Sequence, residues 1–123
     1  HWLGAVYEAH KLESVRIGAI AYLHGHSVGG TNPSLLEALG CGNLVIAHRN
    51  VFNEEVLGDL GWYFGSPDEL ARRMREVQGL GDQERTRLQR TAWECIETRY
   101  SWQGVADAYE QLLRDAVRVE PRG

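Results

Sequence analysis

Short hydrophobic runs alternate with amphipathic stretches along this chain, and their order predicts a layered α/β protein. Two runs, Ile20 to Leu23 and Leu44 to Ala47, have the composition of strands buried on both faces of a parallel sheet. Between them, Asn32 and Pro33 form a helix start, and Gly40 to Gly42 end that helix. Strand, turn, helix and strand in this order predict a βαβ unit with a right-handed crossover.

Further elements are expected on both sides of this unit. Before it, the pattern predicts a strand over Trp2 to Val6 and a helix over Glu8 to Ala19. After it, five elements are predicted in turn: a short helix near Asn53 to Leu57, a strand at Trp62 to Phe64, a helix begun by Ser66, Pro67 and Glu69 as a capping box, a helix capped by Asp82, and a last helix capped by Ser101. The fold class is therefore α/β, with helices at its C-terminal end.

Composition narrows the classes of function. With 123 residues, of which 43% are hydrophobic, the chain can bury one core, so residues 1–123 are predicted to form a single domain. A formal net charge of -4 argues against a nucleic-acid partner. No apolar run approaches the ~20 residues that cross a bilayer. We therefore expect a cytoplasmic protein, with peripheral association at the inner face of the membrane as an alternative.

The turn between the first two apolar runs, HGHSVGGTN, carries the chemistry. A glycine-rich turn that leads into a helix presents backbone N–H groups and the positive end of the helix dipole to an anion. Gly29 and Gly30 let a ligand approach the main chain, and Thr31, Asn32 and Ser34 add short hydrogen-bonding side chains. A diphosphate would fit such a turn. Many turns of this kind bind nothing, and that alternative stays open.

Glu37 lies one turn into the predicted helix. A carboxylate at this place could accept hydrogen bonds from ribose hydroxyls, as acidic residues do in dinucleotide-binding folds. Most helix glutamates are simply solvated, which is the alternative interpretation of this residue.

The run GGTNPSLLEALGCGNLVIA, followed by NEEVLGD and GWYF, resembles the C-terminal domain of retaining glycosyltransferases of family 4, which have the GT-B fold. The likeness is closest to bacterial rhamnosyltransferase-like members. The later YSWQGVADAYEQLL is similar to the closing helices of that family, so the resemblance spans most of the chain. It implies a Rossmann-like parallel sheet, a partial donor-binding domain and a role in polysaccharide biosynthesis.

The resemblance also implies roles for single residues. The family has two glutamates separated by seven residues, and Glu37 matches the second, which binds the nucleotide ribose. Gly29 occupies the position of the first, which touches the donor sugar in the family. The run Gly30 to Pro33 matches the turn that contacts the diphosphate and the sugar, and His26 is placed to bond the turn or a sugar hydroxyl. No residue of the chain is assigned a catalytic role.

By the same resemblance, the complete enzyme would move a sugar from a nucleoside diphosphate to an acceptor glycan or a lipid-linked sugar. The nucleotide sugar is a substrate, and no cofactor or metal is expected. HWLGAV would be the third and IAYL the fourth strand of a sheet ordered 3-2-1-4-5-6. Because strands one and two are not in this sequence, IAYL would have an exposed apolar edge. We therefore expect self-association, exchange of elements, or a longer polypeptide, and an isolated chain that is inactive.

Other interpretations remain. His24, His26 and His48 could form a zinc site. Arg49 could reach a phosphate or lie on the surface. Two other functions are a nucleotide-sugar epimerase, which needs an acid and a base that the sequence does not display, and a non-catalytic domain for nucleotide-sugar binding or assembly.

Overall fold

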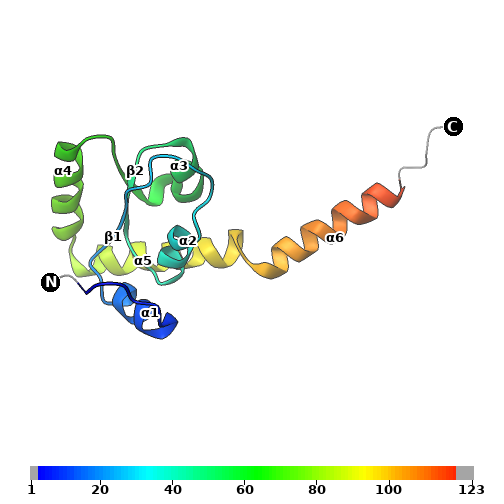
Figure 1. The fold of residues 1–123 in the computed structure, drawn as a ribbon, viewed down its shortest axis with the longest axis horizontal. Helices are drawn as coiled ribbons and strands as arrows, with labels where there is room; N and C mark the ends of the chain where they lie inside the picture. Colours follow the sequence, from blue (N-terminus) through cyan, green and yellow to red (C-terminus); the bar gives the residue numbers. More distant parts are fainter. Residues whose placement is uncertain (1–2, 119–123) are drawn as a thin grey trace.

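The computed structural model describes residues 3–118 and contains one parallel sheet of three strands. The strands are β1 (Tyr22–His24), β2 (Val45–His48) and β3 (Gly61–Phe64), and they lie in the order β1-β2-β3 (Figure 1). This is the order that the resemblance implies for strands four to six. The carboxyl ends of parallel strands lie at one edge of the sheet, so the segments that follow β1, β2 and β3 emerge together.

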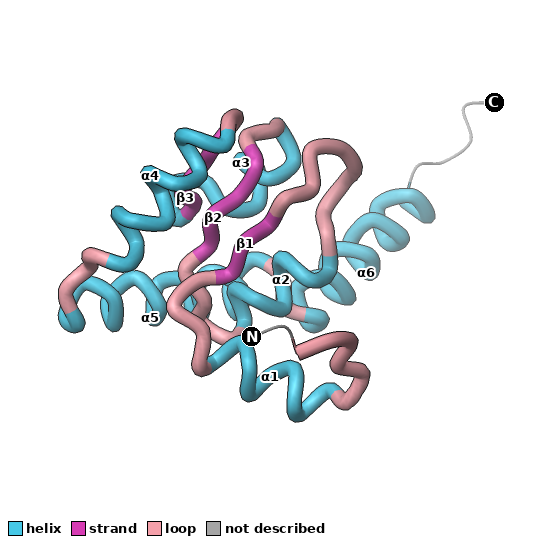
Figure 2. The backbone as a smooth tube through the Cα atoms, turned by 60° about the vertical axis from the view of Figure 1, so that its left-hand side comes forward, coloured by secondary structure: helices cyan, strands magenta, loops and turns pink. Residues whose placement is uncertain are grey.

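Helices flank the sheet on both faces. They are α1 (Ala9–Ile17), α2 (Pro33–Gly40), α3 (Val51–Leu57), α4 (Pro67–Gln78), α5 (Asp82–Arg99) and α6 (Trp102–Arg118), with a 3-10 turn, η1, at Gly58–Leu60. The unit β1, α2, β2 is the βαβ unit that the sequence predicts. Figure 2 shows α4 on one side of the strands, opposite α2 and α5.

Alternate residues of β2, together with Leu44 just before it, contribute to the two halves of the core. Val45 and Ala47 face α2, α3 and α5, where Leu35, Leu39, Val56, Leu57 and Ala92 join them in one buried cluster. Leu44 and Ile46 face α4 and pack with Val77 in a second cluster. The period of two along β2 therefore places one apolar set on each face of the sheet, as expected for a strand buried on both sides.

The predicted helix starts depend on short polar side chains, and most are confirmed. The side chain of Asn32 accepts a hydrogen bond from the Ser34 amide at 3.0 Å, which caps α2. Ser66 accepts one from the Glu69 amide at 3.3 Å, which caps α4. Ser101 caps the first turn of α6 in the same way. The start of α5 differs from the prediction: Gly81 is its N-cap, and Asp82 is the first helical residue.

The strand predicted over Trp2 to Val6 is not formed. Trp2 lies outside the described residues, and residues 3–8 have no regular structure. Gly4 has a φ of 71°, a left-handed conformation that interrupts an extended run. A strand also needs a partner, and in the sheet order implied for this family the third strand does not lie beside the fourth.

Strand β1 forms an open edge of the sheet. The prediction that its apolar run is buried on both faces was wrong, since Ile20 and Leu23 are 57% and 50% exposed. A groove of about 320 Å³ lies beside this edge, lined mostly by apolar side chains of β1, of the two residues before it, of β2 and of α4: Ile20, Ala21, Leu23, Ile46, Met74, Val77 and Gln78. The expected exposed apolar edge is therefore present.

Helix α6 extends away from the rest of the described chain (Figure 1). Its large apolar side chains Val105, Tyr109, Leu112 and Leu113 are all exposed. Among residues 3–118, no helix combines the length and the apolar character that a membrane crossing requires.

Candidate functional site

The turn that follows β1 lies on the surface at the carboxyl ends of the strands. Residues 25–31 are all exposed. Gly29 has a φ of 108°, a conformation that residues with a side chain rarely adopt. A Cβ at Gly29 or Gly30 would meet no atom within 4 Å. The space above both glycines is therefore open, and a ligand could approach the main chain there.

Some of the backbone amides in the first turn of α2 already donate hydrogen bonds within the protein. Pro33 has no N–H, the Ser34 amide donates to the side chain of Asn32, and the Leu35 amide donates to the Asn32 carbonyl at 3.0 Å. The side chain of Asn32 is thus occupied by capping. Within residues 3–118, the amides of Gly29, Gly30 and Thr31 donate no hydrogen bond, so the unused donors beside this helix start belong to the turn.

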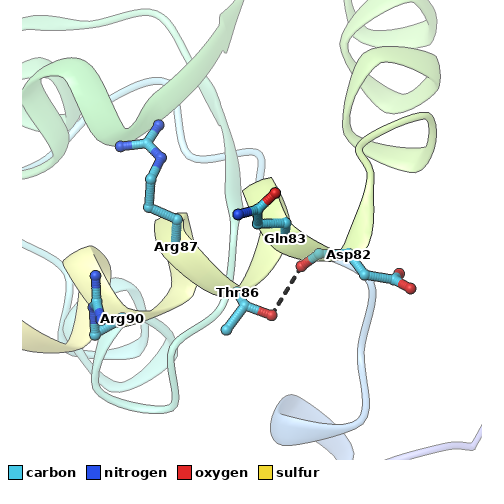
Figure 3. Close-up of a pocket in the computed structure, with 5 residues that line it drawn as sticks. All are labelled: Asp82, Gln83, Thr86, Arg87 and Arg90. Carbon is cyan, nitrogen blue, oxygen red and sulfur yellow. Dashed lines mark hydrogen bonds between the residues drawn. The ribbon is translucent and has the colours of Figure 1, made fainter.

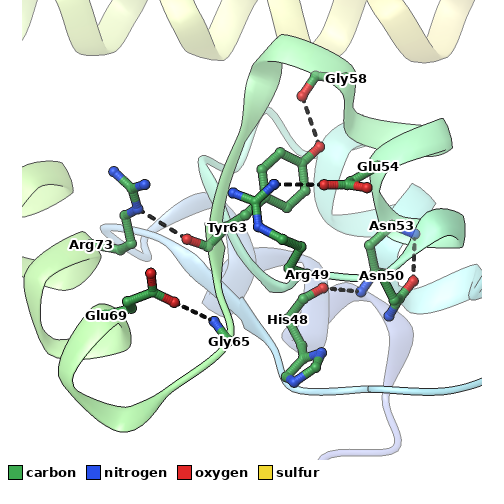
Figure 4. Close-up of polar contacts among 10 residues, drawn as sticks. All are labelled: His48, Arg49, Asn50, Asn53, Glu54, Gly58, Tyr63, Gly65, Glu69 and Arg73. Carbon is green, nitrogen blue, oxygen red and sulfur yellow. Dashed lines mark hydrogen bonds and ion pairs between the residues drawn. The ribbon is translucent and has the colours of Figure 1, made fainter.

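The carbonyl of His26 is held by two asparagines from the start of α3. It accepts hydrogen bonds from the Asn50 side chain at 3.0 Å and from the Asn53 side chain at 3.2 Å. Asn53 is only 4% exposed, and the same amide group donates to the His48 carbonyl at 2.8 Å. Asn53 therefore bridges the segments that leave β1 and β2, and Figure 4 shows its bond to His48.

The imidazole of His26 stacks on that of His24. The ring centroids are 4.7 Å apart and the planes are tilted by 26°. His24 is 1% exposed, and neither of its ring nitrogens has a hydrogen-bond partner within residues 3–118. Burial lowers the pKa of His24, and the neighbouring His26 acts in the same direction. The buried ring is therefore held in its neutral form.

Glu37 forms an ion pair with Arg16 of α1. The Arg16 guanidinium lies 2.7 Å from the Glu37 carboxylate, with Arg16 12% and Glu37 55% exposed. Tyr22 lies near this pair. Burial raises the pKa of the Tyr22 phenol, and the Arg16 charge and a hydrogen bond with Ser34 act against that rise. Solvent still reaches Glu37, so its carboxylate can meet a ligand hydroxyl as well as Arg16.

Arg49 directly follows β2, and its side chain contacts Glu54 and Tyr63. Its guanidinium lies 2.7 Å from the Glu54 carboxylate and 5.1 Å from the centre of the Tyr63 ring (Figure 4). The Tyr63 hydroxyl donates to the Gly58 carbonyl at 2.7 Å. Burial raises the pKa of Tyr63 to about 12, and the Glu54 charge adds to the rise. Arg49 thus takes part in the packing around β3.

The aromatic side chains of β3 and the side chain of Arg73 in α4 pack around the sheet. Trp62 and Phe64 pack against the core cluster of α4, and Tyr63 packs against the other cluster, so side chains of β3 contribute to both halves of the core. Arg73 is half-buried and donates from Nε to the Tyr63 carbonyl at 3.0 Å (Figure 4). A carbonyl at the rim of the sheet draws this side chain inward.

His24, His26 and His48 do not form one cluster. His48 rests edge-on against Phe64, with ring centroids 5.5 Å apart, while His24 and His26 stack on each other. In the part of the chain that the structure describes, no group of three or more histidines, cysteines, aspartates or glutamates is arranged to hold a metal.

A separate hollow lies along α5 (Figure 3). All of its lining residues, Asp82, Gln83, Thr86, Arg87 and Arg90, belong to this one helix. The Thr86 hydroxyl donates to the Asp82 carbonyl at 2.8 Å, and Arg87 is paired with Glu84. The hollow therefore brings no second element together with α5, and the strand ends remain the candidate site.

A parallel sheet with helices on both faces, and a glycine-rich turn between a strand and a capped helix, define a Rossmann-like class of domain. A family model described as "Glycosyl transferase-like" matches residues 5–111. The chain belongs to that glycosyltransferase-like family. Searches of the curated proteins and of the solved structures gave no match.

Sequence reasoning missed Arg16, Asn50 and Asn53. Arg16 lies on a helix with no buried residue and a weak apolar pattern, so nothing marked it as a partner of Glu37. The two asparagines had a usable signal. Asn50 directly follows a buried strand at the edge where ligands bind in open α/β sheets, and Asn53 lies three residues later.

Proposed function

We propose that this chain is the donor-binding part of a retaining glycosyltransferase, which moves a sugar from a nucleoside diphosphate to a glycan or a lipid-linked acceptor. The observation that carries the proposal is the open turn at Gly29 and Gly30, with free amides in front of α2, in a chain that belongs to a glycosyltransferase-like family.

In this proposal each part of the site has a distinct task. The turn amides and the start of α2 bind the diphosphate and stabilise the negative charge that grows on it as it leaves. Glu37 accepts hydrogen bonds from the ribose. His26, which is exposed beside the turn, contacts a hydroxyl of the donor sugar. The acceptor hydroxyl and the residues that activate it belong to a further domain of the complete enzyme, and the transfer needs no metal or other cofactor.

Calorimetric titration of this chain with dTDP, UDP and GDP tests donor binding. Glu37→Ala should weaken binding of the preferred nucleotide. Because this change also breaks the ion pair with Arg16, Arg16→Gln is the matched control, since it breaks the same pair and keeps the carboxylate. Equal weakening by both variants would assign the effect to the ion pair, and no binding of any of the three nucleotides to the parent chain would contradict the proposal.

A non-catalytic domain that binds nucleotide sugars is the second candidate. The observation in its favour is the φ of 108° at Gly29, because a glutamate at this position, as the family has, would be strained. Binding of a nucleotide sugar without its turnover, in the longest polypeptide that carries this chain, would select this candidate. Release of the nucleotide with transfer to an acceptor would exclude it.

We further propose that the open edge of β1 is covered in the working protein, by further strands of a longer polypeptide or by a second copy of the chain. The exposed Ile20 and Leu23 and the groove beside them support this proposal. Light scattering of the isolated chain tests it, and a stable monomer at all concentrations would count against it.

A cytoplasmic location follows from the nucleotide-sugar donor, and a lipid-linked acceptor would bring the enzyme to the inner face of the membrane.

A further inference from the structure

Two independent contacts hold His26, while the rest of its turn is open. From one side, the amide groups of Asn50 and Asn53 both donate to its carbonyl, at 3.0 Å and 3.2 Å. From the other side, the buried ring of His24 stacks under its imidazole at 4.7 Å. The backbone and the side chain of His26 are therefore both held in place, by residues at the start of α3 and in β1.

The asparagines are themselves fixed to the core. The Asn50 side chain accepts a hydrogen bond from the Asn53 amide at 2.9 Å and so caps α3. Val56 and Leu57 of the same short helix are 1% and 2% exposed and lie in the core cluster beneath it. The position of the His26 carbonyl is thus coupled to the core through one turn of helix.

The hydrogen bond from Asn53 to His48 fixes the separation of the chain segments at the ends of β1 and β2. One buried amide group donates to the carbonyl of His26, two residues after β1, and to that of His48, the last residue of β2. Separation of these segments would break at least one of the bonds. Buried amides that lose their acceptors are costly, so this bridge resists opening of the strand ends.

We propose that Asn50 and Asn53 are positioning residues for donor binding, which hold His26 and the start of the glycine turn in the arrangement that the donor meets. The inference rests on the proposed donor-binding function. The asparagines act through His26 and do not touch the donor. Holding the turn in place before the ligand arrives reduces the ordering that binding must bring about, and so raises affinity.

Three variants separate positioning from stability. Asn50→Ser keeps a side chain that caps α3 well but is too short to hold the His26 carbonyl. Asn53→Ala removes both bonds of the bridge. Val56→Ala is the control, because it destabilises the same helix from the core side and leaves both asparagines in place. Each protein is titrated with dTDP, UDP and GDP, its melting temperature is measured, and NMR order parameters are determined for the backbone amides of residues 25–32.

Loss of a neutral hydrogen bond changes an equilibrium by roughly two- to tenfold. Affinity for the preferred nucleotide should therefore fall by about this factor in Asn50→Ser and by more in Asn53→Ala, and the order parameters of the turn should fall in both. Val56→Ala should lower the melting temperature with unchanged affinity and unchanged order parameters in the turn. Unchanged affinity in both asparagine variants would overturn the inference, as would an equal loss in Val56→Ala.

Failure of the proposed function gives a different result. If the parent chain binds no nucleotide, the donor-binding proposal is contradicted, and a role in donor binding for the asparagines is contradicted with it. If the parent binds and Glu37→Ala weakens binding while the asparagine variants do not, the donor site stands and the positioning role alone is excluded.

Discussion

The guanidinium of Arg16 and the carboxylate of Glu37 lie 2.7 Å apart, and this pair joins α1 to α2. Helix α1 has no buried residue, so polar contacts are important for its attachment. A second such contact is the hydrogen bond from the Asn43 side chain to the Arg16 carbonyl at 2.6 Å. The residue expected to bind ribose therefore also ties α1 to α2.

Arg16→Gln should lower the free energy of unfolding by about 0.5 to 1 kcal/mol, because an ion pair open to solvent contributes little more. The difference between variant and parent should shrink in high salt, where exposed charges are screened. Urea unfolding at low and high salt measures both effects. A difference that salt does not change would point to lost packing of the arginine side chain instead of lost charge.

Gly29 and Gly30 should respond differently to the same substitution. Gly29→Ala should destabilise the chain by about 1 to 3 kcal/mol, because φ is 108° at this position. Gly30→Ala should leave stability nearly unchanged, since its Cβ would enter open space. If a donor diphosphate contacts the main chain at this turn, Gly30→Ala should nevertheless weaken nucleotide binding. Normal binding by this variant would show that the ligand does not approach Gly30.

Tyr63 should make the stability of the folded chain decrease at alkaline pH. Its pKa rises from 10.0 to about 12 on folding, so the unfolded chain loses the phenolic proton first. The contribution of Tyr63 is fully present below pH 10 and is lost as pH rises through about 12. Tyr63→Phe should flatten this decline, which unfolding measurements between neutral pH and pH 12 would reveal. An unchanged decline would assign it to other groups.

His24 should make the chain sensitive to acid. Burial lowers its pKa from the usual 6.5, so its contribution to stability is present above pH 6.5 and is lost as pH falls. His24→Phe removes two unpartnered ring nitrogens and keeps an aromatic ring under His26. Stability at neutral pH should rise by about 1 kcal/mol and the acid sensitivity should decrease. A fall in stability would show that a ring nitrogen has a partner, such as a buried water.

Leu23→Lys should reduce self-association of the isolated chain. Leu23 is 50% exposed on the open edge of β1, and a lysine on an edge strand opposes pairing with another chain. Sedimentation or light scattering over a range of concentrations measures the effect. The matching change Leu112→Lys on α6, whose apolar face is also exposed, reports whether that helix contributes.

Local signals predicted most of the elements. The start of α2 follows from Asn32 and Pro33 alone, because a cap and a first-turn proline act within a few residues. Strand β2 follows from an uninterrupted apolar run. By contrast, the strand expected at Trp2 to Val6 had suitable residues and no partner, and a strand depends on both.

The contacts of the candidate site depend on distant parts of the chain. Asn53 and the His26 carbonyl are 27 residues apart, and only the parallel pairing of β1 and β2 brings their neighbourhoods together. The pairing of Arg16 with Glu37 likewise depends on how α1 docks. The sequence could therefore indicate the turn as the site, but not the side chains that hold it in place.

The open edge of β1 has a consequence for how the protein would be regulated. Strand β1 is an edge strand that leads directly into the glycine turn, so whatever covers its open edge also restrains the first residues of the site. Binding at the two places is then thermodynamically linked. If a covering strand raises the affinity for nucleotide by some factor, nucleotide raises the affinity for that strand by the same factor. Assembly of the complete protein and recognition of its donor would reinforce each other.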